Sequence, residues 1–257
     1  MGWEVLKKRI IPVQLLMDGR LVKTVGFDTH RDVGDPVSSS KIYNATYADE
    51  LVFLNISRDH RHVLPMVALI DRVSACCFMP LALGGGIRTA EDAEILIKNG
   101  ADKVVVNSVS YRDMNVISKI ADTFGAQAVV VSIDVRKGGN GNYGLFSDCG
   151  RKFEPVSLEE HIATCVQHGA GEILINSIDR DGAMNGYDID LISRVMSYSM
   201  VPVIACGGAG TYMDMKDAFT QTDVSALACG SLFNFGDNNP IRAKAFLSNY
   251  KIHFKDI

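Results

Sequence analysis

The chain has 257 residues, of which 47% are hydrophobic and 22% charged, and its formal net charge is −4 at pH 7. This length and composition suit one domain with a large core, and the lack of a basic excess argues against nucleic acid as the main partner. No apolar run is long enough to span a bilayer and no signal-peptide core opens the chain, which indicates a cytoplasmic protein without membrane contact.

Eight short runs rich in β-branched residues predict strands, and helical patterns alternate with them. The runs lack polar alternation, which is typical of parallel strands buried on both faces. We expect strands at 9–16, 51–57, 80–84, 103–107, 128–134, 172–178, 201–206 and 225–230, with helices between them such as 89–99, 113–124, 158–168 and 213–219. Such alternation predicts a single TIM (β/α)8 barrel domain over 1–257. A Rossmann sheet is the rival, but no GxGxxG motif follows the first strand.

The two halves of the chain resemble each other. Residues 80–86 (PLALGGG) recur as 202–208 (PVIACGG), and 50–54 (ELVFL) recur as 172–176 (EILIN) at the same separation. Residues 10–15 (IIPVQL) match 129–134 (VVVSID) at nearly that separation. Three matches in one order predict a two-fold internal repeat of half-barrels. The last match ends on Leu15 in one half and on Asp134 in the other, so only one copy carries an acid.

Glycine pairs follow several predicted strands, at the end of the barrel where active sites lie. Glycines there let backbone N–H groups approach an anion, and barrels often bind phosphate after their last two strands. A single glycine pair is more often a tight turn, whereas two repeat-related sets favour a ligand with a phosphate at each end. The candidate residues are Gly207, Gly208, Gly230 and Ser231, with counterparts at Gly85, Gly86, Asn107 and Ser108.

A set of motifs covers nearly the whole chain: KRIIP at 8–12, DGR at 18–20, GDP at 34–36, DEL at 49–51, GGGI at 84–87, GADK at 100–103, GAGEI at 169–173, SIDRDG at 177–182 and GGAG at 207–210. These motifs closely resemble the HisF family, the cyclase barrels of imidazole glycerol phosphate synthase. The resemblance implies that ammonia from a glutaminase, HisH, docked at the N-terminal face, crosses the barrel to a phosphorylated substrate.

The resemblance also assigns roles to single residues. The family's ammonia gate matches Arg9, Glu50, Lys103 and Glu172. Such a ring could merely stabilise the barrel bottom, but charges entering an apolar interior must pair to offset their desolvation, and apolar residues would serve stability as well. We therefore interpret the ring as a gate and expect Asp102 to lie near the docked glutaminase.

The family's two catalytic acids match Leu15 and Asp134. Leucine has no titratable proton, so a mechanism that divides acid and base work between two carboxylates loses one of them. The resemblance adds Asp181 to the catalytic residues. It adds Gly182 to the substrate-binding residues, together with Lys23, which lies on the long loop expected after the first strand.

The run QLLMD at 14–18 departs from the cyclase pattern. It resembles a HisF-like subfamily associated with acetamidino modification of surface-polysaccharide sugars, which implies a HisH-like glutaminase and an ATP-dependent sugar amidotransferase as partners. The main hypothesis is therefore an ammonia-conducting subunit for sugar amidination. The alternative is an authentic cyclase, a lyase of histidine biosynthesis, and a weaker third is a phosphate-binding scaffold without catalysis.

No cofactor or metal is expected. His60, His62, His161 and His168 share neither ligand spacing nor a common face, and the six cysteines form no CxxC motif, which favours reduced, buried thiols. The glycine-rich segment 138–142 predicts a hairpin after the fifth strand.

Overall fold

Eight parallel strands form a closed barrel in the computed structural model of the chain, which describes residues 7–57, 62–139 and 141–255. Each strand pairs with its neighbour in chain order and the last pairs with the first, which confirms the predicted TIM barrel. Every predicted strand overlaps an observed one. The barrel strands are β1 (Arg9–Met17), β4 (Leu51–Asn55), β5 (Leu81–Gly84), β6 (Lys103–Val106), β7 (Val129–Lys137), β10 (Glu172–Ser177), β11 (Val203–Cys206) and β12 (Ala226–Cys229).

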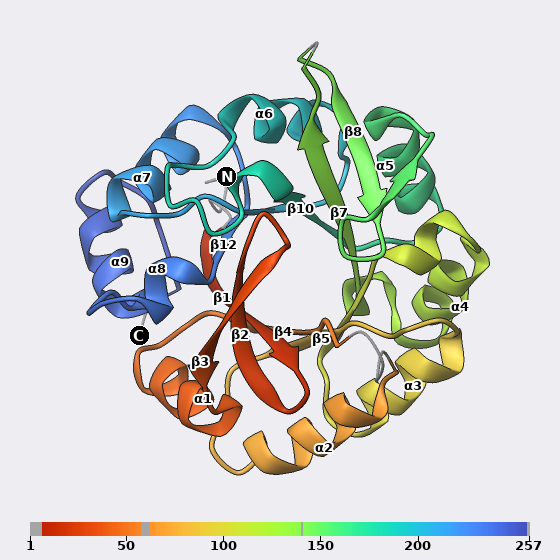
Figure 1. The fold of residues 1–257 in the computed structure, drawn as a ribbon, viewed down its shortest axis with the longest axis horizontal. Coiled ribbons are helices and arrows are strands. Elements are labelled where there is room, and N and C mark those ends of the chain that lie inside the picture. The colour runs from red at the N-terminus through yellow and green to blue at the C-terminus, as the bar shows by residue number, and fades with distance from the viewer. Residues whose placement is uncertain (1–6, 58–61, 140, 256–257) are drawn as a thin grey trace, which may run out of the picture.

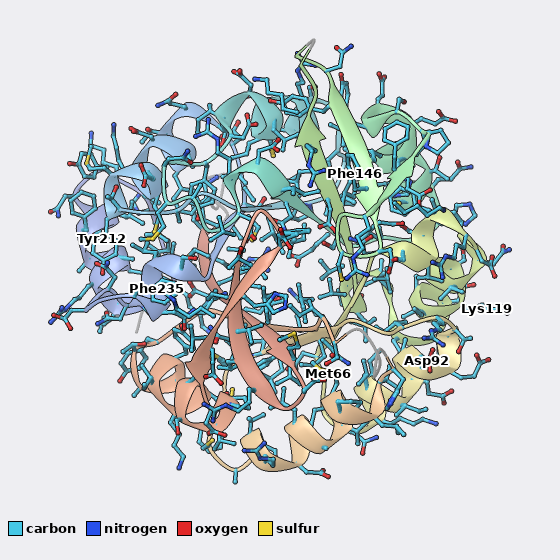
Figure 2. All side chains as sticks on the ribbon, in the orientation of Figure 1. Met66, Asp92, Lys119, Phe146, Tyr212 and Phe235 are labelled. Carbon is cyan, nitrogen blue, oxygen red and sulfur yellow. The ribbon has the colours of Figure 1, made fainter. Side chains whose placement is uncertain are left out.

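Helices surround the barrel (Figure 1), and charged side chains such as Asp92 and Lys119 lie at its outer edge (Figure 2). The four helices that the sequence analysis names correspond to α3, α4, α5 and α7. No helix in the described ranges has the length and apolar character needed to cross a membrane. The helices are α1 (Pro36–Ala45), α2 (Leu64–Val73), α3 (Ala90–Lys98), α4 (Asn115–Phe124), α5 (Leu158–Gln167), α6 (Ile189–Tyr198), α7 (Tyr212–Gln221), α8 (Ser231–Asn234) and α9 (Pro240–Ser248), with short 3-10 turns η1 (Ser108–Tyr111), η2 (Ala126–Ala128) and η3 (Ile178–Arg180).

Two antiparallel hairpins extend from the barrel strands. The predicted hairpin after the fifth strand is confirmed, because β8 (Tyr143–Ser147) pairs with β7 and with β9 (Lys152–Glu154). The expected long loop after the first strand is instead a hairpin of β2 (Arg20–Val25) and β3 (Thr29–Gly34). Its cause is an Asp-Gly turn: Asp18 and Gly19 have φ of 51° and 80°, the left-handed pair that a type I′ hairpin turn requires.

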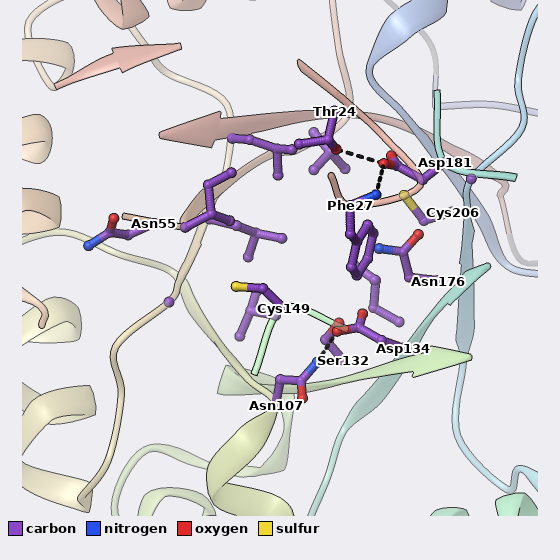
Figure 3. Close-up of a pocket in the computed structure, with 18 of the residues that line it drawn as sticks. Thr24, Phe27, Asn55, Asn107, Ser132, Asp134, Cys149, Asn176, Asp181 and Cys206 are labelled. Carbon is purple, nitrogen blue, oxygen red and sulfur yellow. Dashed lines mark hydrogen bonds between the residues drawn. The ribbon is translucent and has the colours of Figure 1, made fainter. Parts of the chain in front are cut away.

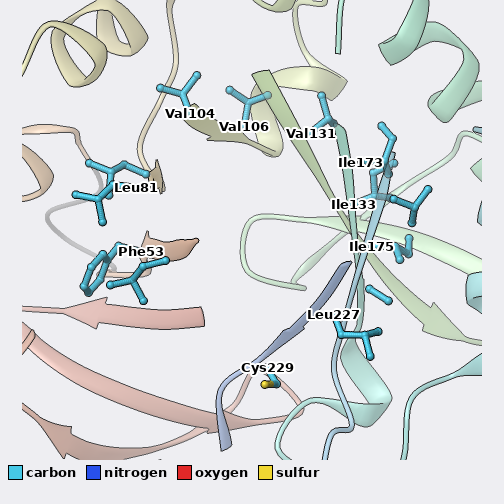
Figure 4. Close-up of a cluster of buried hydrophobic side chains, with 14 of the residues drawn as sticks. Phe53, Leu81, Val104, Val106, Val131, Ile133, Ile173, Ile175, Leu227 and Cys229 are labelled. Atoms are coloured by element: carbon cyan, nitrogen blue, oxygen red, sulfur yellow. The ribbon is translucent and has the colours of Figure 1, made fainter. Parts of the chain in front are cut away.

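Two apolar layers share the barrel strands. Side chains alternate along each strand, so Ile10 and Leu16 of β1 point outward into the large cluster under the helices, part of which Figure 4 shows. Ile11 and Val13 point inward, into a narrow cluster along the barrel axis that ends on Leu15. The interior is thus a packed apolar column, and polar chemistry is confined to its two ends.

The internal repeat extends to helix capping. Thr89 opens α3 by accepting a hydrogen bond from the Asp92 backbone N–H, while the Asp92 side chain accepts from the Thr89 backbone N–H. Thr211 and Asp214 form the same reciprocal box at the start of α7. Each box satisfies two helix donors that would otherwise lack partners.

We predict that Thr89→Ala and Thr211→Ala each lower the free energy of unfolding by about 1 kcal/mol, the usual cost of removing a threonine cap. Chemical denaturation of each variant measures the loss. The matched control is Thr123→Ala, because the Thr123 hydroxyl bonds only the Lys119 carbonyl within α4 and caps no helix start. A control as destabilised as the two cap variants would contradict the assignment.

Candidate functional site

A cavity of about 730 Å³ opens where the barrel strands end. The β2–β3 hairpin supplies part of its wall, and Figure 3 shows several lining side chains. The structure brings together in this one cavity all the residues predicted for chemistry and for substrate binding: Leu15, Lys23, Gly85, Gly86, Asn107, Ser108, Asp134, Asp181, Gly182, Gly207, Gly208, Gly230 and Ser231.

Asp134 projects from β7 into the cavity floor and is only 6% exposed. Its Oδ2 accepts a hydrogen bond of 2.8 Å from the Asn107 side-chain amide (Figure 3). Burial raises the pKa of Asp134 to about 7, against hydrogen bonds from Asn107 and Asn176 that favour the carboxylate. A group with a pKa near neutrality can both give and take a proton, as general acid–base catalysis requires.

Asp181 faces the same cavity from the turn after β10. Its Oδ2 accepts a 2.6 Å hydrogen bond from the Thr24 hydroxyl and a 3.1 Å bond from the Phe27 backbone N–H, so the carboxylate fastens the β2–β3 hairpin over the site. Burial raises its pKa despite those two donors. The cavity therefore holds two carboxyl groups with raised pKa values, and Leu15 contributes none.

Leu15 is half-buried and joins the apolar column with Leu54 and Cys206. It lies on β1, paired with Val22 of the hairpin and Leu54 of β4. The acid position of the repeat is thus filled by a side chain that offers the cavity apolar surface and no proton.

Lys23 and Gly230 lie against each other at the turn after β12, where the sequence analysis predicts an anion site. Lys23 is 7% exposed, and its ammonium donates a 2.6 Å hydrogen bond to the Val13 carbonyl. A Cβ on Gly230 would lie 1.9 Å from that nitrogen, so the glycine makes room for the charge. Burial lowers the pKa of Lys23. The Cys206 and Cys229 thiols and Asp181 oppose this effect, but the pKa stays below its ordinary value. A cation held beside the β12 turn suits an anionic ligand group.

The ring of charges predicted as a gate is present at the opposite end of the column. Arg9 contacts Glu50 at 3.1 Å and Glu172 at 2.6 Å, and Lys103 contacts the same two carboxylates at 2.7 and 2.9 Å. Each cation pairs with both anions. Although burial alone would raise the pKa of Glu172, Arg9 and Lys103 lower it, so Glu172 is held as a carboxylate. Oε1 of Glu50 is buried without a hydrogen-bond partner among the described atoms.

Asp102, predicted to lie near a partner, is an exposed residue directly before β6. Its Oδ2 accepts a 2.8 Å hydrogen bond from the Leu81 backbone N–H, which fixes the start of β5. It lies on the same N-terminal end of the barrel as the ring.

Sequence reasoning missed Asn176 and Thr24. Asn176 is the penultimate residue of β10 and lines the cavity, and its repeat counterpart is the apolar Leu54. A polar residue in one half facing an apolar one in the other is the same signal that singled out Asp134 against Leu15, and it could have identified Asn176. Thr24 gave no such signal, because its role depends on a contact with Asp181, far along the chain.

Across 7–57, 62–139 and 141–255, no three His, Cys, Asp or Glu side chains are placed to share a metal ion, and His60 lies outside these ranges. The six cysteines, all within these ranges, form no disulfide with one another.

The comparisons with known proteins agree on one family. The model of the family described as "Histidine biosynthesis protein" matches residues 9–239. "Putative imidazole glycerol phosphate synthase subunit hisF2" of Pseudomonas aeruginosa is 45% identical over 90% of this chain and 92% of its own length. "Imidazole glycerol phosphate synthase subunit HisF" is 42% identical in Hyphomonas neptunium (95% and 96% covered) and 39% identical in Alkaliphilus metalliredigens (97% and 99%). The chain therefore belongs to the histidine biosynthesis protein family, and within it to the HisF group.

Proposed function

We propose that this chain is the ammonia-using barrel subunit of an imidazole glycerol phosphate synthase-type complex. A glutaminase of the HisH type covers the N-terminal end of the barrel, and ammonia passes the ring of Arg9, Glu50, Lys103 and Glu172. A ligand with phosphate at both ends occupies the cavity at the other end. The names of the relatives support this assignment and the cyclase reaction, a lyase step of histidine biosynthesis.

The observation that carries the proposal is the placement of charge along one axis. Four fully paired charges close one end of the column, ten buried apolar residues fill its middle, and two carboxyl groups with raised pKa values lie at the other end. Neutral ammonia can cross an apolar column, whereas ammonium would need desolvation at a cost of many kcal/mol. A scaffold that only bound phosphate would gain nothing from the ring.

Leu15 favours a second candidate reaction, the supply of ammonia for acetamidino modification of a surface-polysaccharide sugar, together with an ATP-dependent sugar amidotransferase. In that reaction the barrel conducts ammonia and the acid lost at position 15 is not needed. Asp134 and Asp181 remain, so the two reactions are separated by measuring cyclase turnover.

The second candidate predicts that the wild-type chain, given saturating ammonium salt, converts the imidazole glycerol phosphate precursor slowly, and that Leu15→Asp raises kcat by roughly 10²- to 10⁴-fold, the usual contribution of one positioned acid or base. Leu15→Asn is the matched control, because asparagine has the same shape as aspartic acid but no titratable proton. Fast wild-type turnover that Leu15→Asp does not increase would exclude the sugar-amidating candidate and show that Asp134 and Asp181 suffice.

We predict that inorganic phosphate binds at the turn of Gly230 and Ser231 beside Lys23, with a mirrored site at Gly86 and Ser108. Gly230→Ala should weaken phosphate binding by at least about tenfold, because its Cβ would displace the Lys23 ammonium. Gly139→Ala is the control, since a Cβ there meets nothing within 4 Å. Equal affinity of the two variants in calorimetric titration would contradict the second-half site.

We predict that Lys103→Met changes the ratio of glutamine-dependent to ammonia-dependent product in the reconstituted complex, because it removes two of the four contacts that close the ring. The control is Lys244→Met, which breaks another buried pair, with Asp49 at 2.6 Å, outside the ring. Both variants should have a lower melting temperature. If Lys103→Met lowers the melting temperature and leaves the ratio unchanged, the ring is structural.

A further inference from the structure

A buried polar cluster lies behind the cavity wall, between η1 and α5. His161 of α5 stacks on Tyr111 with ring centroids 4.0 Å apart and planes 5° from parallel. The His161 Nε2 lies 3.2 Å from the Ser110 hydroxyl and 3.6 Å from the Cys165 thiol. Ser110, His161 and Cys165 are at most 2% exposed. The proposed function uses none of these side chains.

The direction of the hydrogen bonds follows from counting protons. The Ser110 hydroxyl has one proton and donates it to the Asn107 carbonyl at 2.7 Å. It must therefore accept from His161, whose Nε2 carries the proton. Burial lowers the pKa of His161 to about 4, so the ring is neutral at physiological pH and its tautomer is set by this contact.

This series of contacts ends on the Asp134 carboxylate. Asn107 has its backbone carbonyl held by Ser110, through the hydroxyl at 2.7 Å and the backbone N–H at 2.9 Å, and its side-chain amide on Asp134. Its φ and ψ of −136° and −88° lie outside the helical and extended regions, so the backbone needs such an anchor. Fixing one end of Asn107 fixes the direction from which its amide meets the carboxylate.

The other half of the barrel shows that the fold does not need polar residues here. At the separation that relates Gly85 to Gly207, Leu232 takes the place of Ser110 and Phe233 that of Tyr111. Leu232 is fully buried, and Phe233 packs against Tyr43. Burying a serine and a histidine costs more than burying a leucine unless every bond is made. The polar version follows β6, which pairs with the acid-bearing β7, whereas the apolar version follows β12, which pairs with β1 and its Leu15.

We propose that His161 and Ser110 are positioning residues that hold the Asn107 amide on the Asp134 carboxylate. Asp181, Cys206, Asn176 and Tyr111 are the other polar or titratable groups that act on Asp134, and Glu154 is the charged group that acts on His161. Of these groups, Asn176 is the one that also donates a hydrogen bond to the Asp134 carboxylate, so Asn107 supplies one of its two amide donors.

The test is an NMR titration of the Asp134 carboxyl carbon in Ser110→Ala and His161→Phe, compared with wild type and with Asp134→Asn for assignment. His161→Phe keeps the stacking on Tyr111 and removes the donor. A loosened amide stabilises the carboxylate less, so the pKa of Asp134 should rise by roughly 0.5 to 1 in both variants.

The matched controls are Ser118→Ala and His168→Phe. Ser118 and His168 form the same kind of bond, 2.9 Å from hydroxyl to Nδ1, between α4 and the end of α5, without contact with the site. These variants should leave the pKa of Asp134 unchanged. Folded Ser110→Ala with a wild-type Asp134 pKa would overturn the proposal, and this small truncation keeps the test available if His161→Phe does not fold.

A second readout rests on the proposed function. If Asp134 titrates in the ammonia-dependent reaction, the pH dependence of kcat/KM should move upward with its pKa in Ser110→Ala and not in Ser118→Ala. The NMR titration needs no substrate, so failure of the proposed reaction leaves its result intact, whereas an unmoved carboxyl pKa refutes the positioning role by itself.

Discussion

Closure of the parallel sheet is the constraint from which the other features follow. Once β12 pairs with β1, the sheet has no edge in the barrel, and every second side chain must enter the same narrow interior. Ile11, Val13 and Leu15 of β1 show the result: three inward positions, each at a different height. A charged group can therefore enter only where a strand begins or ends, which places the ring at one end and the carboxyl groups at the other.

The two ends handle buried charge in opposite ways. In the ring each cation meets both anions, and the pKa of Glu172 lies below its usual range in spite of burial. At the cavity, neutral amides face Asp134 and its pKa rises to about 7. Burial is common to both ends, so what differs is the supply of counter-charge. The arrangement gives a paired ring of charges at the N-terminal end of the column and a carboxyl group able to exchange protons at the other end.

The sequence predicted what local pattern determines and missed what distant contacts determine. Strand runs and repeated glycines sufficed for the barrel, its repeat and the residues around the cavity. The β2–β3 hairpin was interpreted as a loop although its Asp18–Gly19 turn carried the signal. His161 was considered only as a metal ligand, because its bond to Ser110 joins residues 51 positions apart, a contact that no periodicity reveals.

The repeat also shows how one scaffold can hold two different ends. Both glutamates of the ring, Glu50 and Glu172, are repeat-related, whereas both cations come from the first half. At the cavity, Lys23 on the Val13 carbonyl and Asn107 on Asp134 are likewise unequal. Symmetric backbone turns are therefore lined by different side chains. If a ligand with a phosphate at each end binds there, as we propose, these side chains distinguish its two ends.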